Sequence, residues 1–157
     1  MGILQRFSDI MSANINSLLS GAEEKNAGKL LEKYLADARA NLEELKSETS
    51  AIIADEMAAA RRVNANNEEI AKYDRYAEQA VMAGNDDDAR KFLDAKSQLV
   101  SKKAELESAY ELAKSNSDKM RQMTRKLMED IASAEGKMVE LRAKLTVAEH
   151  KEKMDDL

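Results

Sequence analysis

Residues 82–92 read MAGNDDDARKF, and this short polar stretch separates two long helical patterns. Gly84 and Asn85 both tolerate left-handed backbone angles, which a tight turn requires. The aspartates that follow, beginning with Asp86, can cap a new helix and favour its positive end. We therefore predict a hairpin tip near residues 83–88, with Gly84, Asn85 and Asp86 between two helices.

The composition is typical of long helices rather than of a mixed globular fold. The 157 residues include no proline and five glycines, with 35% charged and 4% aromatic residues. Such a profile predicts an all-α chain rich in coiled coil. The glycines divide it into an amphipathic helix over 1–21, a connector over 22–28 and a hairpin over 29–157, whose first helix is expected to start near residue 28.

A heptad repeat runs without interruption from Leu31 to Ala80. Alternating steps of four and three residues visit fifteen positions, of which twelve are apolar or tyrosine. A seven-residue repeat of this length implies a left-handed coiled coil. The three polar positions, Thr49, Glu56 and Asn66, are expected to lower stability and to fix the register.

The second long helix carries a matching stripe. Every seventh residue from Phe92 to Ala148 is apolar. A heptad also needs a second apolar position between the residues of this stripe. Ala109 lies three residues after a stripe residue, whereas Ile131 lies four residues after one, so we predict that the register shifts near residue 127. Folding about the tip pairs residues whose numbers sum to about 171, so we expect a long antiparallel coiled-coil hairpin.

The charge distribution supports the same pairing. Residues 22–88 carry a net charge of −7 and residues 89–157 a net charge of +2, and oppositely biased helices favour each other as partners. The second helix contains a basic cluster of Lys114, Lys119, Arg121, Arg125 and Lys126. We interpret it as a solvated flank near Glu48, Asp55 and Glu56. A nucleic-acid or lipid patch is the alternative, although the total charge of −5 argues against general nucleic-acid binding.

Nothing in the sequence predicts an enzyme, a cofactor or a metal site. There is no cysteine, and the single histidine, His150, lies near a charged end. Phosphate-binding and dinucleotide-binding glycine motifs are absent, as is a Glu-x-x-His pattern for a di-metal centre. No apolar run approaches the about 20 residues of a membrane span, and the first residues do not match a signal peptide. We therefore expect a cytoplasmic protein.

Residues 1–21, MGILQRFSDIMSANINSLLSG, predict an amphipathic helix of unusual width. At about 100° per residue, its large apolar side chains fill an arc of about 180°, wider than a partner-helix stripe. Arg6 is the single basic residue of the polar face, which predicts sensitivity to gaps between headgroups rather than to lipid charge. The alternative is that this helix docks back on its own hairpin. The predicted membrane-binding residues are Ile3, Leu4, Arg6, Phe7, Ile10, Met11, Ile15, Leu18 and Leu19.

One such helix is expected to bind lipid weakly. Burial of its apolar side chains stabilises by about 10–20 kcal/mol gross, and ordering each backbone residue costs about 1 kcal/mol or more. Firm binding therefore needs several copies, which predicts a homo-oligomer. Leu145 and Ala148 extend the apolar stripe beyond the residues that the first helix can cover, so we predict an oligomer contact there. Fraying of the helix end is the alternative.

The stretches MGILQRFSDIMSANINSLLSGAEE and AGNDDDARKFL resemble the phage shock protein A family, and the resemblance covers essentially the whole chain. This family is related to the vesicle-inducing protein in plastids and to ESCRT-III. The resemblance implies a peripheral protein at the inner face of the cytoplasmic membrane, with an α-helical hairpin that assembles into coats. It implies that these coats bind and remodel stressed bilayers. In some bacteria a family member also inhibits an AAA+ transcription activator.

Two features depart from the family pattern. Members usually carry Ala-Glu-Asp-Pro after the first helix, whereas Ala22, Glu23 and Glu24 are followed here by Lys25. Members also usually continue with further C-terminal helices that lock neighbouring subunits. Our functional hypothesis is a non-enzymatic membrane-stress protein that binds lipids and oligomerises. The alternatives are a soluble coiled coil that sequesters an AAA+ activator, and a structural spacer.

Overall fold

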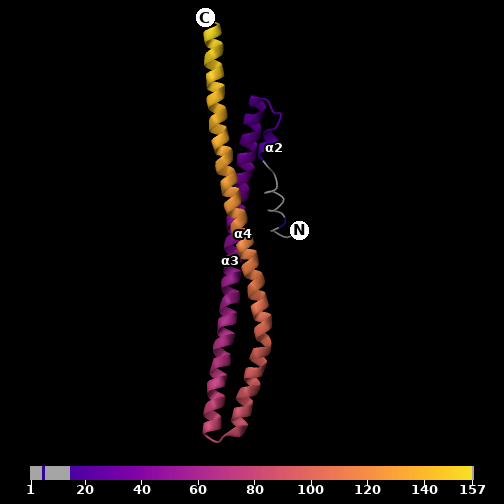
Figure 1. Cartoon of the computed structure of the whole chain (residues 1–157), viewed down its shortest axis with the longest axis vertical. Coiled ribbons are helices and arrows are strands. Elements are labelled where there is room, and N and C mark those ends of the chain that lie inside the picture. The colour runs from indigo at the N-terminus through magenta and orange to yellow at the C-terminus, as the bar shows by residue number, and fades with distance from the viewer. Residues whose placement is uncertain (1–4, 6–14, 157) are drawn as a thin grey trace. The chain divides into compact units, whose positions relative to one another are not determined.

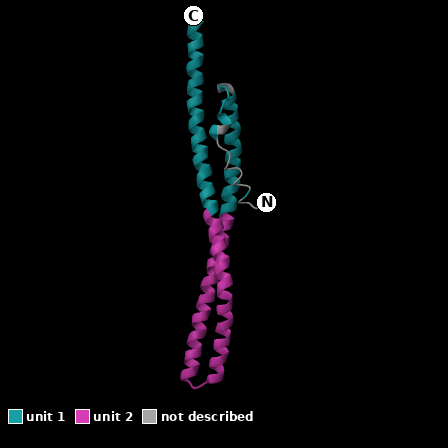
Figure 2. Cartoon of the chain, turned by 45° about the vertical axis from the view of Figure 1, so that its right-hand side comes forward, with its two compact units in different colours: residues 1–49, 119–157 teal, residues 50–118 magenta. Residues whose placement is uncertain are grey.

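The computed structural model describes Gln5 and residues 15–156, and the elements within this part of the chain are helices. They are α2 (Ile15–Leu19), α3 (Glu24–Met82) and α4 (Asp86–Asp155), as Figure 1 shows. The chain forms two compact units, one of residues 1–49 and 119–157 and one of residues 50–118 (Figure 2). Both α3 and α4 run through both units. The predicted all-α helical hairpin is confirmed.

The unit of residues 50–118 contains the end of α3, the turn and the start of α4, with the two helices side by side. Asn66 of α3 donates a hydrogen bond from Nδ2 to the backbone oxygen of Leu99 in α4 at 3.0 Å. Near the turn, the Phe92 ring lies 5.4 Å from the Tyr76 ring and 6.2 Å from the Tyr73 ring, centroid to centroid. The residues of α3 and α4 that face each other form a seam between the two helices. This seam and the aromatic cluster hold the antiparallel pair together near its tip.

The tip closes α3 and opens α4 within three residues. Gly84 has a φ of 74°, and the backbone nitrogens of Gly84 and Asn85 donate to the carbonyl oxygens of Val81 (3.0 Å) and Ala80 (2.8 Å). This is the bonding pattern of a Schellman motif, which satisfies the last carbonyls of a helix. Asn85 rather than an aspartate caps α4, since its Oδ1 accepts a hydrogen bond from the Asp88 nitrogen at 3.3 Å. Asp86, Asp87 and Asp88 occupy the first turn, where the helix dipole favours negative charge.

The other unit pairs the first half of α3 with the second half of α4. Its core side chains are almost fully buried: Leu31 and Leu45 of α3 and Met120 and Ala134 of α4 are no more than 1% exposed. Outside this core, the Arg39 guanidinium binds the Glu135 carboxylate at 2.9 Å between the two helices.

The heptad of α3 describes its buried face. All fifteen positions from Leu31 to Ala80 are buried or half-buried. Two of the polar positions make hydrogen bonds that explain how burial is tolerated: Asn66 as described above, and Thr49, whose Oγ1 donates to the Leu45 oxygen at 2.6 Å. Thr49 Oγ1 also lies 3.2 Å from Thr124 Oγ1 of α4. Since buried polar groups with partners cost far less than unpaired ones, these residues can fix the register at little expense.

In α4, the predicted position of the register shift is wrong. Ala109 is exposed, whereas Tyr110 is half-buried and Ser117 is fully buried. The register of Ile131 therefore extends back through Thr124 and Ser117 to Tyr110, and no shift occurs near residue 127. The prediction failed because it counted only apolar residues, and here hydroxyl-bearing side chains occupy the seam.

The start of α3 also differs from the expectation. The helix begins at Glu24 and includes Gly28, although the sequence placed residues 22–28 in a connector. The Ala27 nitrogen donates to the Glu23 oxygen at 2.7 Å, which forms the first helical turn. No proline interrupts this turn, and one glycine inside a helix costs only about 1 kcal/mol. The division of the chain into membrane helix, connector and hairpin remains a prediction.

Two glycine-to-alanine substitutions should have opposite effects on stability. Gly84→Ala places a side chain at a left-handed position and should lower the free energy of unfolding by about 1 kcal/mol. Gly136 lies inside α4, and a methyl group added there would meet open space. Gly136→Ala should therefore raise the free energy of unfolding by about 0.5–1 kcal/mol. Urea denaturation followed by circular dichroism measures both. Equal effects would show that the turn does not depend on a left-handed residue.

Ser117→Ala should stabilise the protein. The Ser117 side chain is fully buried, and its Oγ has no hydrogen-bond partner among the described residues. Removing an unpaired buried hydroxyl should raise the free energy of unfolding by about 1–2 kcal/mol, measured by urea denaturation. Ser101→Ala is the control, because Ser101 is exposed and its Oγ bonds the Ser97 oxygen at 3.0 Å. A gain no larger than that of the control would contradict the prediction.

Candidate functional site

A tight turn places α2 beside the first turns of α3. Gly21 has a φ of 78°, and the Ala22 nitrogen donates to the Leu19 oxygen at 3.2 Å. A left-handed residue after a helix ends it and reverses the chain, and glycine adopts this conformation without strain. The chain therefore reverses its direction, and α2 lies beside the start of α3 (Figure 1).

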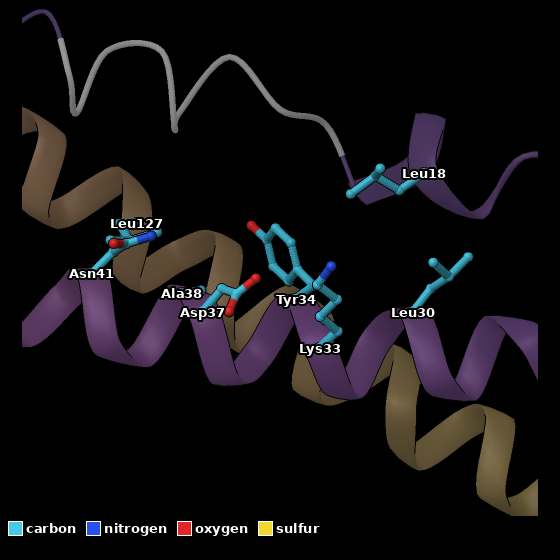
Figure 3. A pocket seen from close by; sticks show the side chains of 8 residues that line it. All are labelled: Leu18, Leu30, Lys33, Tyr34, Asp37, Ala38, Asn41 and Leu127. Carbon is cyan, nitrogen blue, oxygen red and sulfur yellow. The ribbon is translucent and has the colours of Figure 1, made fainter.

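An apolar groove separates α2 from α3, with a volume of about 370 Å³. Leu30 and Tyr34 project from α3 toward the side of α2 that carries Leu18 (Figure 3). We call this surface the α2 groove. Its lining residues are Leu18 of α2, Leu127 of α4 and, from α3, Leu30, Lys33, Tyr34, Asp37, Ala38 and Asn41.

The Tyr34 side chain forms a wall of the α2 groove and stays uncharged. Burial raises the pKa of the Tyr34 phenol, and the nearby Asp130 carboxylate raises it further. Both causes disfavour the phenolate, so the folded protein keeps the neutral ring. The α2 groove consequently combines an aromatic wall with the aliphatic side chains of Leu18, Leu30 and Leu127.

Three of the predicted membrane-binding residues lie in α2. Ile15 is buried, with 7% of its surface exposed, Leu19 is half-buried and Leu18 is 47% exposed. In this structure, part of the apolar arc is therefore in contact with protein. The other predicted lipid contacts lie outside the described residues: Ile3, Leu4, Arg6, Phe7, Ile10 and Met11.

The heptad pattern of the sequence does not predict the α2 groove. Leu30 and Tyr34 precede the seam residues Leu31 and Leu35 by one position each, so they fall on a second face of α3. Large apolar residues next to a complete heptad were the available signal, because a coiled coil alone does not need them.

Gly84 and Asn85 lie in the turn between α3 and α4, where Gly84 provides the left-handed backbone and Asn85 caps α4, and Asp86 is the first residue of α4. Next to this turn, Met82 is 87% exposed. Tyr76, Ala80 and Phe92 contribute to a shallow hollow beside the tip.

The end of α4 presents a second exposed apolar surface. Leu145 is half-buried, whereas Ala148 is exposed. Val147 is 68% exposed, and it lines a shallow hollow together with Ala143, Ala148 and the side chains of Lys144 and Lys151. Val147 lies outside the predicted apolar stripe of every seventh residue from Phe92 to Ala148. Of the two predicted oligomer contacts, the structure therefore places Ala148, and not Leu145, in this hollow.

Ion pairs lie on the exposed flanks of both helices. Lys126 binds Asp130 of its own helix at 3.3 Å, and the pairing of the basic cluster with Glu48, Asp55 and Glu56 stays a prediction. Between the helices, Lys96 binds Asp74 at 2.7 Å, in addition to the Arg39 pair. All these side chains are partly exposed to solvent, so each pair contributes only about 0–1 kcal/mol. The seam, and not surface charge, dominates the pairing of α3 and α4.

The described residues contain no group of three or more His, Asp or Glu side chains placed to hold a metal ion. Within the same part of the chain, no helix is long and apolar enough to cross a membrane. The features that remain as candidates for function are the α2 groove with its amphipathic helix and the exposed end of α4.

The sequence of this chain is similar to that of several known proteins. The sequence profile of the PspA/IM30 family matches residues 2–156. The chain is 42% identical over 157 residues to the phage shock protein A homolog of Bacillus subtilis, and it covers 68% of that protein. Identity to the membrane-associated protein Vipp1 is 25% over 157 residues in Nostoc punctiforme and 29% over 150 residues in Synechocystis. The chain spans 60% and 55% of the length of these two Vipp1 proteins. With a family match over nearly every residue, the chain belongs to the PspA/IM30 family.

Proposed function

We propose that this protein takes part in a membrane-stress response by binding the surface of a bilayer through residues 1–21. The observation that carries the proposal is the wide apolar arc of that segment, within a chain that the PspA/IM30 family matches over residues 2–156. The Vipp1 relatives, which are described as membrane-associated, support it. The bilayer we propose is the cytoplasmic membrane at its inner face, with the protein bound peripherally.

The proposed mode of binding is shallow insertion. A helix with large side chains over half its circumference buries them at the boundary between headgroups and acyl chains. Arg6 is the only lysine or arginine among residues 1–21, so attraction to anionic lipid contributes little. Binding then depends on exposed acyl chain, which stressed or curved bilayers offer. This dependence would direct the protein to damaged membrane.

Assembly supplies the affinity that one helix lacks. Because the gross gain from insertion is close to the cost of ordering the segment, many linked helices are needed for stable attachment. We propose that copies associate through the exposed apolar end of α4, where Val147 and Ala148 lie, in the manner of ESCRT-III coats. A coat of this kind would stabilise or remodel the bilayer beneath it. The regulatory alternative, inhibition of an AAA+ activator by a soluble hairpin, requires no lipid contact.

Charged substitutions in the apolar arc should abolish lipid binding. Phe7→Asp and Leu18→Asp each place a carboxylate where acyl chains are expected, so flotation with phosphatidylethanolamine–phosphatidylglycerol vesicles should fall about tenfold or more. Ser20→Asp is the matched control, since Ser20 is exposed and follows α2 on the polar side. Unchanged flotation of the two arc variants would overturn the lipid assignment and leave the regulatory alternative.

A charge at the end of α4 should weaken assembly without unfolding the hairpin. Val147→Asp and Ala148→Asp should shift the sedimentation profile toward monomers, because a desolvated carboxylate opposes apolar contact. Thr146→Asp adds the same charge in the same helical turn but outside the hollow. Sedimentation velocity and negative-stain microscopy measure the outcome. If all three variants assemble like the unmodified protein, this surface is not the subunit contact.

A further inference from the structure

We propose that α2 is an autoinhibitory latch: the α2 groove holds the end of the amphipathic helix in the lipid-free protein, and a bilayer competes with the α2 groove for the same side chains. The inference rests on the proposed lipid binding and adds its regulation. The two roles exclude each other, since an apolar side chain is buried in one place at a time.

The competing side chains are visible in the structure. Ile15 is buried and Leu18 lines the α2 groove, although both belong to the apolar arc that the bilayer would take up. Opposite them, Leu30 and Tyr34 point toward α2 (Figure 3). Docking thus covers apolar surface on both helices, which stabilises the closed arrangement in water.

Leu30 and Tyr34, which point toward α2, are separate from the hairpin core, although Ala38 and Leu127 of that core form the floor of the α2 groove. Leu31 and Leu35 are 1% and 5% exposed in the seam with α4, whereas Leu30 retains 38% exposure. The hairpin can therefore keep its own core whether or not α2 is docked. This separation lets the latch open without unfolding α3 and α4, as a switch requires.

The docked state is weakly held. The helix α2 has five residues, Leu18 remains 47% exposed, and the α2 groove keeps a volume of about 370 Å³. A ligand shifts such an equilibrium by its differential affinity for the two states. A bilayer with exposed acyl chain offers fuller burial than this shallow groove, and an intact bilayer offers less, so the latch raises the threshold for binding.

Reversible cross-linking tests the latch. The protein has no native cysteine, so Leu18→Cys with Leu30→Cys gives a single reactive pair. A short reducible bis-methanethiosulfonate reagent should link this pair within one chain in the absence of lipid. The linked monomer should float with phosphatidylethanolamine–phosphatidylglycerol vesicles about tenfold less than the same sample after reduction. The control pair is Leu18→Cys with Ala36→Cys, because Ala36 is exposed and lines the opposite flank of α3; it should link poorly.

The outcomes separate the two proposals. If the unmodified protein does not float, lipid binding itself is wrong, and the latch falls with it. If the linked and reduced proteins float equally, lipid binding stands and the latch is wrong. If the Leu30 pair links no faster than the Ala36 pair, α2 does not dock and the latch is again wrong.

A second variant needs no cross-link. Leu30→Ser removes an apolar wall of the α2 groove and should increase flotation about threefold or more, since it weakens only the closed state. Leu93→Ser is the matched control, because Leu93 is 48% exposed and lies in the unit of residues 50–118. Equal flotation of the two variants would overturn the latch.

Discussion

A long helix cannot bury its own apolar stripe, and this requirement governs the structure. The stripe of α3 needs a second helix along its length, and the antiparallel return of α4 supplies it in each of the two units. A return of this kind needs a turn that ends one helix and starts the next without leaving backbone groups unpaired. The Schellman bonds around Gly84 and the Asn85 cap meet that need.

Polar residues in the seam then decide which register the two helices take. Alanine and leucine alone permit several sliding alignments, because one apolar contact resembles the next. The bond from Asn66 to the Leu99 oxygen and the Thr49–Thr124 contact form only when these residues meet. Ser117, fully buried without a described partner, shows that such positions can also carry a cost.

The same requirement extends to the N-terminal segment, where it connects the fold to the proposed function. An amphipathic helix beside a finished hairpin has two possible covers, the α2 groove and a lipid surface. Membership of the PspA/IM30 family, with membrane-associated Vipp1 among the relatives, supports the lipid surface. The position of Leu18 in the lining of the α2 groove supports the groove. A protein that answers to membrane stress gains from both, since a covered helix responds only where the bilayer exposes acyl chain.

The sequence by itself determined the helical class, the place of the turn and the buried face of α3, because these follow from local periodicity and from glycine, asparagine and aspartate at fixed offsets. It also showed the apolar arc of residues 1–21, but not which surface covers it. Tertiary structure decided which residues of α4 face α3, where Ser117 and Thr124 replace apolar residues, and it placed α2 across the α2 groove from Leu30 and Tyr34. Those choices depend on which side chains meet across space. Periodicity along one chain records that a face is to be buried, whereas the partner that buries it is set by packing between elements.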